Sequence, residues 1–455
     1  MPRSLPIRSV LAALLFTALA GAADAGTSAE TVREVPVAAG ALASAIAGAS
    51  PGDVLILAPG LHQGPVTLDR PLTLDGRGQA VIDGGGTGSV VTITGSDITL
   101  RGAEIRGSGS DGSTIDSGVQ VLRTAQRVLI EDNRIIGNLH GVDVHGALDT
   151  TVRGNVIEGR TAGRVNERGN GVYVWNAPGT LVERNDIRHG RDVIFSNASK
   201  QGIYRDNLFR DLRFAVHYMY TNDSVISGNV SIGNTLGYAL MFSNKITVTG
   251  NLSLRDRTHG MMLNYANNSV VRGNLIRGGT HEKCTFIYNA HKNLIEGNRF
   301  EGCGIGIHFT AGSERNVLTG NAFIGNQTQV KYVGTRHVEW SDGKRGNYWS
   351  DHPAFDLDGN GLADSAFRPN DLMDHILWSQ PAARLLLGSP AVQLVRWSQA
   401  SFPAILPGGV VDSAPLMLAP EIPVPDHIAT MEAAARPAWL NEMSEDADTD
   451  PLAGH

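Results

Sequence analysis

The chain has 455 residues and a formal net charge of −7 at neutral pH. This mildly acidic balance argues against a nucleic-acid-binding protein, which would need a basic surface. Glycine is abundant, with 54 residues, whereas aromatic residues make up only 6% of the chain. Such a composition is typical of short strands joined by many turns.

Residues 1–25 have the pattern of a secretory signal peptide. Arg3 and Arg8 precede an apolar stretch from Val10 to Ala20, which is too short to span a bilayer. Ala23-Asp24-Ala25 has the form of a cleavage site. We therefore expect an exported, soluble protein, and the glycine-rich repeats that follow favour the bacterial periplasm.

Residues 38–49 are rich in alanine and predict a short amphipathic helix. Short apolar strands bounded by Gly, Pro and Asp follow from Asp53 onward. A repeat array needs a cover at its open end, so we expect this helix to cap the N-terminus of the array.

Asparagine recurs with a period near 22 residues, in a nearly constant context such as Gly154-Asn155-Val156-Ile157 and Gly228-Asn229-Val230-Ser231. A fixed period of this length with short apolar strands predicts a solenoid. We expect a right-handed parallel β-helix over residues 26–340, with about 22–24 residues per coil. Stacked Asn side chains can form a hydrogen-bonded ladder between coils. The recurring residues are Asn133, Asn155, Asn185, Asn207, Asn229, Asn251, Asn274, Asn298 and Asn321.

The step from Asn155 to Asn185 is 30 residues long and contains an insertion near Thr161–Gly169. An insertion in a solenoid must leave the stack as a loop. Two interpretations stay open: a tolerated surface loop, or a contact for a partner.

One strand of each coil presents its middle residue to the outside, because side chains alternate along a strand. Equivalent residues of successive coils stack about 4.8 Å apart. Met219 lies on the same face as His217. Aligning the coils predicts an outer column of Asp143, Tyr173, His217, Met241, Met262, Phe286 and His308.

Thioether and imidazole ligands together select Cu(I). The candidate copper ligands are His217, Met219, Met241, Met262 and His308, of which His308 lies two rungs from Met262 because Phe286 interrupts the column. The alternative is that the methionines belong to the core or to a docking face. An error of one residue in the register would turn the column inward.

Asp143 and His145 could form an acid–base pair on the surface of the β-helix. A polysaccharide lyase or epimerase would use such a pair. However, no neighbouring column supplies the clustered carboxylates expected of a glycoside hydrolase. A carbohydrate-binding β-helix without catalysis is a further alternative.

The two cysteines are Cys284 and Cys303. Aligning the coils by their Asn residues places Cys303 over His281, so Cys284 is three residues out of column. Export permits a disulfide, and free buried thiols stay open as well. We favour both over a metal cluster with His281, because one His and two Cys make an incomplete site.

Beyond Trp340 the Asn period stops, and residues 341–420 are expected to form a C-terminal cap. Residues 381–400 predict a helix that Pro390 breaks or kinks. Residues 421–455 end in acidic side chains with few apolar ones, and they predict a disordered tail.

A calcium-like loop lies within this cap, with Gly361 at its sixth position. Its twelfth position is Phe367 instead of Glu, so Asp351 or Asp371 would complete the shell. We expect a structural calcium ion, and the alternative is an Asp/Gly-rich turn without metal. The ligands would be Asp356, Asp358, Asn360, the carbonyl of Leu362, and Asp364.

Several blocks of the chain resemble the NosD family, the periplasmic β-helix proteins of nitrous oxide reductase maturation. The blocks are Gly346-Asn347-Tyr348-Trp349-Ser350-Asp351, Phe355-Asp356-Leu357-Asp358-Gly359-Asn360-Gly361, Leu386-Leu387-Gly388-Ser389-Pro390-Ala391 and Gly408-Gly409-Val410-Val411-Asp412-Ser413-Ala414-Pro415. The resemblance covers nearly all of residues 26–420.

This resemblance implies assembly with the ABC transporter subunits NosF and NosY, the ATPase and the permease. It also implies cooperation with the copper chaperone NosL and delivery of copper, or copper and sulfur, to nitrous oxide reductase. The chain has no Gly-x-x-x-x-Gly-Lys-[Ser/Thr] motif, so the transporter would use the ATP. We therefore expect a non-enzymatic maturation factor that handles copper transiently as Cu(I).

Overall fold

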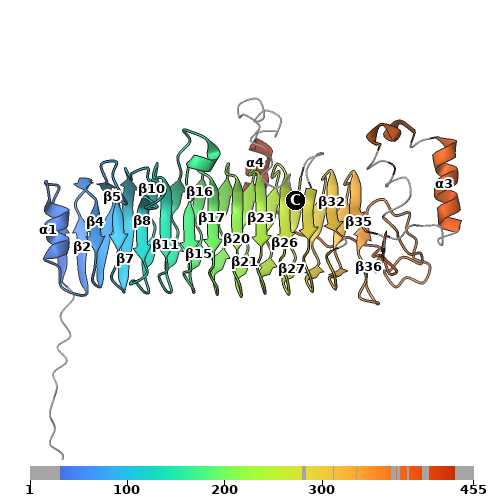
Figure 1. Cartoon of the computed structure of the whole chain (residues 1–455), viewed down its shortest axis with the longest axis horizontal. Helices are drawn as coiled ribbons and strands as arrows, with labels where there is room; N and C mark the ends of the chain where they lie inside the picture. Colours follow the sequence, from blue (N-terminus) through green and yellow to red (C-terminus); the bar gives the residue numbers. More distant parts are fainter. Residues whose placement is uncertain are drawn as a thin grey trace, which may run out of the picture.

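The computed structural model describes residues 31–278, 283–310, 312–334, 336–369, 376, 380–386, 389–401 and 409–435. The expected signal peptide lies outside the described residues. Figure 1 shows an elongated solenoid whose strands stack in parallel from coil to coil, so the predicted β-helix is confirmed.

One side of the solenoid is a 12-stranded parallel sheet that contributes one strand per coil. From the N-terminal end its strands are β4 (Val66–Leu68), β6 (Val91–Ile93), β8 (Ser117–Leu122), β11 (His140–His145), β14 (Val172–Trp175), β17 (Asp192–Asn197), β20 (Phe214–Met219), β23 (Leu236–Met241), β26 (His259–Asn264), β29 (Lys283–Tyr288), β32 (Ile305–Thr310) and β35 (Thr328–Val333).

A 24-stranded sheet forms the rest of the wall. In the regular coils it has two rows of three-residue strands that meet at the Asn turn. The row before the turn is β9 (Leu129–Glu131), β12 (Thr151–Arg153), β15 (Leu181–Glu183), β18 (Ile203–Arg205), β21 (Val225–Ser227), β24 (Thr247–Thr249), β27 (Val270–Arg272), β30 (Leu294–Glu296) and β33 (Val317–Thr319). The row after it is β10 (Arg134–Ile136), β13 (Val156–Glu158), β16 (Asp186–Arg188), β19 (Leu208–Arg210), β22 (Val230–Ile232), β25 (Leu252–Leu254), β28 (Leu275–Arg277), β31 (Arg299–Glu301) and β34 (Ala322–Ile324).

Helix α1 (Ala41–Ala47) covers the N-terminal end, as the alanine-rich segment predicts (Figure 1). Its buried residues Leu42 and Ile46 join the interior of the solenoid. The first, less regular coils add β1 (Val32–Val35), β2 (Asp53–Leu57), β3 (Gly60–Gln63), β5 (Leu72–Asp83) and β7 (Ile98–Arg106).

The predicted Asn ladder runs through the interior of the wall. The side-chain oxygen of Asn229 accepts hydrogen bonds from the backbone nitrogen and Nδ2 of Asn207, at 3.1 and 2.8 Å. Its own Nδ2 donates to the Tyr204 carbonyl at 2.8 Å and to Asn251 at 3.0 Å. The ladder consists of Asn133, Asn155, Asn185, Asn207, Asn229, Asn251, Asn274, Asn298, Asn321 and Asn347.

The solenoid extends beyond the boundary at residue 340 that the Asn period predicts. Asn347 forms a last rung under Asn321, and β37 (Tyr348–Trp349) pairs with β34. Sequence spacing misses this rung because it is 26 residues from Asn321. The buried carboxylate of Asp412 then ends the ladder, accepting hydrogen bonds from Asn347 N at 2.7 Å and from Trp349 Nε1 at 2.8 Å.

Aromatic rings close the C-terminal end of the core. Trp349 stacks on Phe323 at 4.3 Å between centroids, and the fully buried Trp340 lies beside both. Strands β36 (His337–Glu339) and β38 (Gly409–Val411) pair over this end. Helix η2 (Pro381–Leu386) ends before Pro390 and helix α3 (Pro390–Ser401) begins there, as the predicted break requires. Helix α3 lies beyond the last coil (Figure 1).

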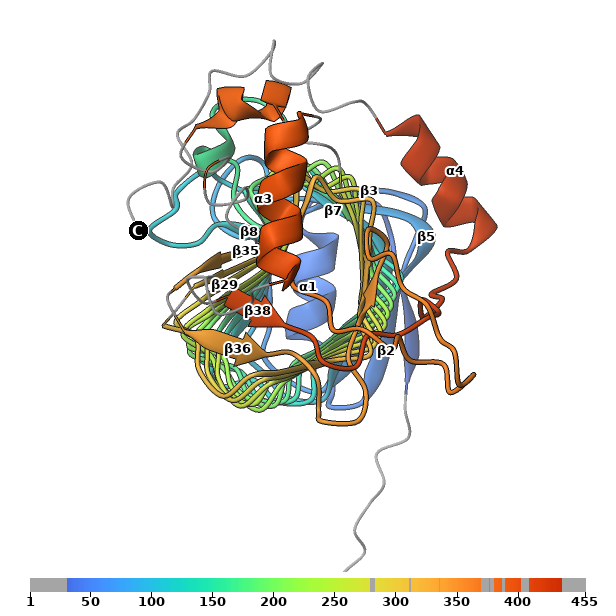
Figure 2. The ribbon, with the colours of Figure 1, turned by 90° about the vertical axis from the view of Figure 1, so that its right-hand side faces the viewer.

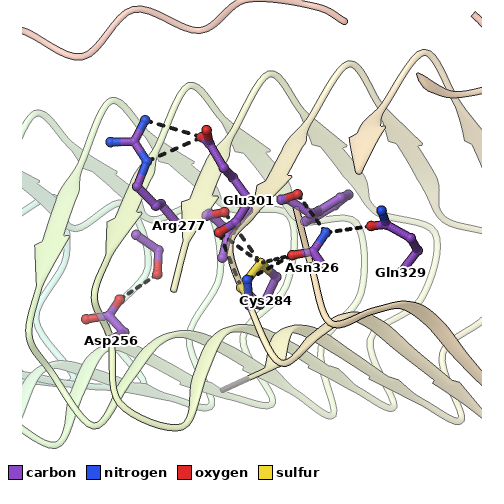
Figure 3. The surroundings of a disulfide bond; sticks show 10 residues. Asp256, Arg277, Cys284, Glu301, Asn326 and Gln329 are labelled. Atoms are coloured by element: carbon purple, nitrogen blue, oxygen red, sulfur yellow. Dashed lines mark hydrogen bonds and ion pairs between the residues drawn. A yellow bond between two sulfur atoms is a disulfide. The ribbon is translucent and has the colours of Figure 1, made fainter. Parts of the chain in front are cut away.

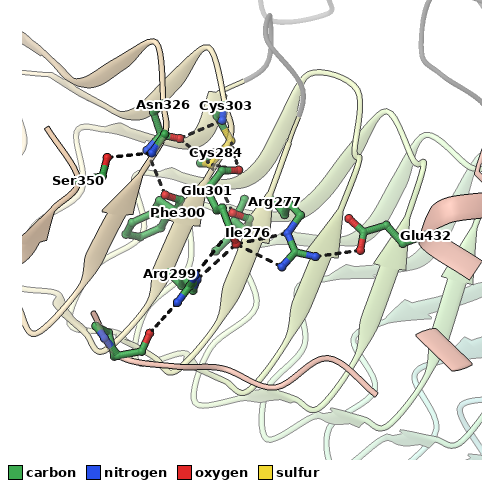
Figure 4. Close-up of polar contacts among 12 residues, drawn as sticks. Ile276, Arg277, Cys284, Arg299, Phe300, Glu301, Cys303, Asn326, Ser350 and Glu432 are labelled. Carbon is green, nitrogen blue, oxygen red and sulfur yellow. Dashed lines mark hydrogen bonds and ion pairs between the residues drawn. A yellow bond between two sulfur atoms is a disulfide. The ribbon is translucent and has the colours of Figure 1, made fainter. Parts of the chain in front are cut away.

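The prediction of a disordered tail is wrong for residues 421–435. Helix α4 (Asp426–Ala434) lies against the outside of the wall, where Ile428 packs into an apolar cluster with Leu254 and Leu275 (Figure 2). Figure 4 shows Arg277 bridging Glu301 and Glu432, and the distance to Glu432 is 3.0 Å. The apolar residues of this short segment have no clear helical spacing, so the sequence alone does not predict a helix. The helix is stabilised by packing on apolar side chains of the solenoid wall. Residues 436–455 lie outside the described residues.

Cys284 and Cys303 form a disulfide, with their Cα atoms 5.7 Å apart (Figure 3). Both lie inside the wall. The predicted three-residue offset is confirmed, because β29 pairs with β32 so that the position opposite Cys284 lies three residues after Cys303. Cys303 lies in the turn between β31 and β32, and this turn brings the two sulfur atoms together. The disulfide excludes the metal cluster; His281 lies outside the described residues.

Asn229→Ala should lower the free energy of unfolding by about 2–4 kcal/mol, because it leaves buried donors and acceptors of Asn207, Asn251 and Tyr204 without partners. Urea denaturation followed by circular dichroism measures this. The control is Asn197→Ala, in β17 but outside the ladder. Equal unfolding midpoints for both variants would contradict a stabilising ladder.

Candidate functional site

The predicted outer column exists on the 12-stranded sheet, but one residue was misplaced. The register places Ala239, and not Met241, between His217 and Met262. Met241 instead pairs with Met219. A slip of two residues keeps a side chain on the same face, so the alternating pattern could not detect it. The outer column is Asp143, Tyr173, Phe195, His217, Ala239, Met262, Phe286, His308 and Lys331.

His217 is oriented by a buried carboxylate. Its Nδ1 lies 3.1 Å from Oδ2 of Asp192, a residue one coil earlier that is fully buried. Arg213 holds the same carboxylate through two hydrogen bonds of 2.8 Å. Burial raises the pKa of Asp192, but the hydrogen bonds from His217 and Arg213 outweigh it, so this pKa lies below its usual range.

Because Asp192 is ionised, it accepts a hydrogen bond from the Nδ1–H of His217. In neutral His217 the lone pair then lies on Nε2, which is buried and has no hydrogen-bond partner among the described residues. Histidine ligands of metals commonly donate their other ring N–H to a carboxylate. The pair of Asp192 and His217 therefore fits a metal ligand and its orienting group.

Met219 and Met241 are the thioethers nearest to His217 in the register. They are register partners on β20 and β23, and Met219 lies two residues after His217 on one face. Both side chains are partly exposed. Adjacent strands lie about 4.8 Å apart, so these three side chains occupy one small area of the surface.

Met262, the third methionine of the candidate set, is not accessible from the surface. It is fully buried in an apolar cluster with Phe214, Leu236 and Ala239, against which Met241 packs. Met262 therefore differs from Met219 and Met241, which are partly exposed. Met262 packs in this cluster on the outer face of the sheet and offers no exposed thioether to an ion.

His308 is not brought to this set, because Ala239, Met262 and Phe286 separate it from His217 in the column. Burial, together with the charges of Lys331 and Lys283, lowers the pKa of His308 to about 3. A positively charged neighbourhood disfavours a bound cation. We therefore leave His308 out of the candidate copper site.

An exposed aromatic stack borders the two methionines. Tyr220 follows Met219 and Phe242 follows Met241, and their rings stack at 5.3 Å. Tyr265 continues the stack at 5.1 Å from Phe242. Tyr220 is 54% exposed, and all three residues have positive φ angles near 50°. The equivalent turn residues of the neighbouring coils, Ala198 and Asn289, have the same conformation, so it belongs to the repeating turn of the solenoid.

Asp143 and His145 lie at the other end of the same face. Their nearest atoms are 3.9 Å apart, which is too long for a hydrogen bond. Gln120 donates to Asp143 at 3.1 Å, and burial raises the pKa of this carboxyl to about 7. His145 stacks on Trp175 at 4.3 Å. The pair is therefore close in space but not joined as an acid–base pair.

The calcium-like loop brings Asp356, Asp358 and Asp364 together, with one ligand oxygen of each within 4.8 Å of the others. Several of these oxygens accept backbone hydrogen bonds, such as Gly361 N to Asp356 at 2.8 Å. Asp351 is used elsewhere, since it accepts from Gln329 at 3.0 Å. Asp371 lies outside the described residues, and the Asn360 side chain accepts from Leu362 N at 2.8 Å.

Sequence reasoning missed Asp192, Arg213 and Phe214. A signal was available, because His217 and Ala239 each lie ten residues after a ladder asparagine, Asn207 and Asn229. Counting from the ladder would have placed Ala239, and not Met241, in the column with His217. No local motif marks Asp192, because 25 residues separate it from His217.

Within the described residues, no helix is long and apolar enough to cross a membrane. Residues 155–354 match the family model described as "Periplasmic copper-binding protein (NosD)". Two relatives are named "Probable ABC transporter binding protein NosD". The one from Stutzerimonas stutzeri is 42% identical over 377 residues, covering 80% of this chain and 86% of the relative. The one from Pseudomonas aeruginosa is 42% identical and covers 80% and 88%.

Among solved structures, the A-module of mannuronan C-5 epimerase AlgE6 from Azotobacter vinelandii is similar at 18% identity, with a TM-score of 0.49 over 65% of this chain and 91% of that module. An alginate lyase from Paenibacillus has 18% identity and a TM-score of 0.42, over 58% of this chain and 94% of the lyase. Identity and coverage with the two curated relatives carry the assignment: the chain belongs to the NosD family of periplasmic copper-binding proteins.

Proposed function

We propose that this protein is a non-enzymatic maturation factor that presents Cu(I) for nitrous oxide reductase, together with an ABC transporter. The proposal rests on the surroundings of His217. Its Nδ1 is hydrogen-bonded to the buried carboxylate of Asp192, and its Nε2 has no hydrogen-bond partner among the described residues. Met219 and Met241 lie beside it in the strand register. One imidazole and two thioethers form a soft ligand set, which favours Cu(I) over Zn(II) or Cu(II).

The partial exposure of both methionines allows an ion to enter and leave from the surface. Tyr220, Phe242 and Tyr265 provide an aromatic surface beside the site, and aromatic residues are enriched in protein interfaces. We propose that partners dock here: NosL brings copper, and the reductase receives it. The family name of the relatives supports an ABC transporter, for which NosF and NosY are the proposed subunits.

We further propose that the Asp356–Asp364 loop binds structural calcium. The loop joins the segment that ends the Asn ladder, because Ala363 N donates to the Pro415 carbonyl and Met417 N to the Gly361 carbonyl. An ion held by Asp356, Asp358 and Asp364 would therefore stabilise the C-terminal end of the solenoid, where Asp412 lies. Export by the signal at residues 1–25 is part of the same proposal.

Replacing both thioethers, Met219→Leu with Met241→Leu, should keep the fold because volume and apolarity are nearly preserved. Cu(I) affinity, measured by competition with a chromogenic chelator, should fall at least tenfold. Asp192→Asn should weaken it by about 10–100-fold, as expected for a group that orients a ligand. Met262→Leu is the matched control and should bind as the unchanged protein does. Unchanged affinity in the double variant would contradict ligation by thioethers.

Asp143 provides a test of whether its buried carboxyl affects only the stability of the protein. Its folded pKa of about 7 exceeds that of an unfolded Asp, so the folded state binds more protons between these values. Stability therefore decreases as the pH rises from 4 to 7, and Asp143→Asn should restore on the order of 1–3 kcal/mol at pH 8 while changing little at pH 4. Chemical denaturation at both pH values measures this, with the exposed Asp223→Asn as control. A loss of copper delivery to the reductase in a stable Asp143→Asn protein would contradict a purely structural role.

Calcium should raise the thermal unfolding midpoint of the protein after treatment with a chelator. Asp358→Asn should remove this response, because it deletes a carboxylate ligand from the loop. The exposed Asp342→Asn, in a different turn, should retain it. Identical melting curves with and without calcium would reject the calcium site.

A further inference from the structure

The insertion after β13 is fixed to the surface instead of projecting freely. Arg160 donates to Ser110 Oγ at 2.7 Å, to the Gly109 carbonyl at 2.8 Å and to the Gly137 carbonyl at 3.1 Å. Where the insertion returns, Gly169 has a φ of +73°, and a Cβ there would collide with the Leu139 carbonyl. The insertion, with its short helix η1 (Val165–Glu167), therefore holds one position over the 12-stranded sheet.

A cavity of about 420 Å³ lies between this insertion, the loop at residues 110–115 and the sheet. Its floor contains the rings of Tyr173 and Phe195, stacked at 5.3 Å with 6° between their planes. Phe195 also contacts His217 at 4.8 Å, but neither His217 nor the methionines line the cavity. The cavity is therefore separate from the candidate copper site.

Three groups in this cavity call for different hydrogen-bond partners. Asn170 is 3% exposed, and its Oδ1 has no hydrogen-bond partner among the described residues, so it needs a donor. Asn170 N donates to His140 Nδ1 at 3.1 Å, so Nε2 of neutral His140 carries the proton and needs an acceptor. Nε of Arg191 is buried and likewise lacks a hydrogen-bond partner in the described part of the chain.

Charged side chains of both signs surround the cavity, with Arg191 and Glu167 in its lining. Burial, followed by the charges of Arg191 and Arg160, lowers the pKa of His140 to about 4, against the opposing effect of Asp116. Arg191 lies 3.7 Å from Asp192, but Arg213 and His217 already hold that carboxylate. The guanidinium of Arg191 therefore keeps charge available for an anionic ligand.

We propose that this cavity binds a uronic acid, a pyranose ring that carries a carboxylate. The apolar C–H groups of the sugar ring would lie against the outward edges of Tyr173 and Phe195, whose faces stack on each other. A ring hydroxyl donates to Asn170 Oδ1, and another oxygen accepts from His140 Nε2. The carboxylate pairs with Arg191, because a charged guanidinium–carboxylate contact is stronger than a neutral hydrogen bond.

Other ligand classes fit less well. A simple anion would satisfy Arg191 but would leave Asn170 Oδ1 without a donor and the aromatic floor uncovered. A neutral sugar would leave Arg191 without its anion. The opposite side of the cavity is the polar loop with Asn166 and Glu167, so hydroxyl groups on that side of a sugar ring would meet polar groups.

Isothermal titration of the full-length mature protein with D-glucuronate, D-glucose and inorganic phosphate tests the proposal. Saturable binding of glucuronate in the millimolar range or tighter, at least tenfold stronger than that of glucose or phosphate, would support it. Equal binding of glucose would refute the role of Arg191, equal binding of phosphate would reduce the cavity to an anion site, and no binding of glucuronate would overturn the proposal.

Substitutions of the cavity residues test whether glucuronate binds in this cavity. Tyr173→Ala and Arg191→Gln should each weaken glucuronate binding by about tenfold or more, as expected for a lost ring contact and a lost charged hydrogen bond. Trp175→Ala is the matched control, because Trp175 lies two residues from Tyr173 on the same face of β14 but does not line the cavity. Unchanged thermal midpoints verify the fold. Glucuronate binding that survives Tyr173→Ala but not Trp175→Ala would place the ligand elsewhere and reject the cavity.

Discussion

The buried column of asparagine side chains is the constraint on which the rest of the molecule depends. Each amide both accepts from one neighbour and donates to the next, so a coil cannot slide relative to its neighbour without leaving polar groups unpaired in the wall. The register of the wall then sets the register of the 12-stranded sheet. Asp412 ends this column at the C-terminus with an acceptor that needs no further partner in the ladder.

Because the register is fixed, residues more than twenty positions apart become neighbours on the outer face. Asp192 and His217 come from different coils, as do Met219 and Met241. A solenoid can therefore build a metal-binding surface on rigid strands without a loop to position it. Asp192 is buried and doubly bound by Arg213, so its orientation, and through it the orientation of His217, is set before any ion arrives.

The chemical character of the side chains on this outer face changes along the solenoid. The cavity under the insertion has Arg191 in its lining, and next to it the His217 region combines one carboxylate-bound imidazole with thioethers. Toward the C-terminal end, the lysines around His308 make the surface positive. Only the middle region joins soft ligands with partial exposure, which explains why the copper proposal is restricted to His217, Met219 and Met241.

The sequence by itself determined the repeat, the Asn ladder, the cap helix and the outward face of His217, because these follow from spacing and from the alternation of side chains. It also carried the family resemblance through its C-terminal blocks. Only the tertiary structure decided which rung Met241 occupies, since a slip of two residues leaves the pattern of faces unchanged. It also decided the pairing of Asp192 with His217, the Cys284–Cys303 disulfide and the docking of helix α4. These contacts join residues from different coils or distant segments, and no local propensity encodes them.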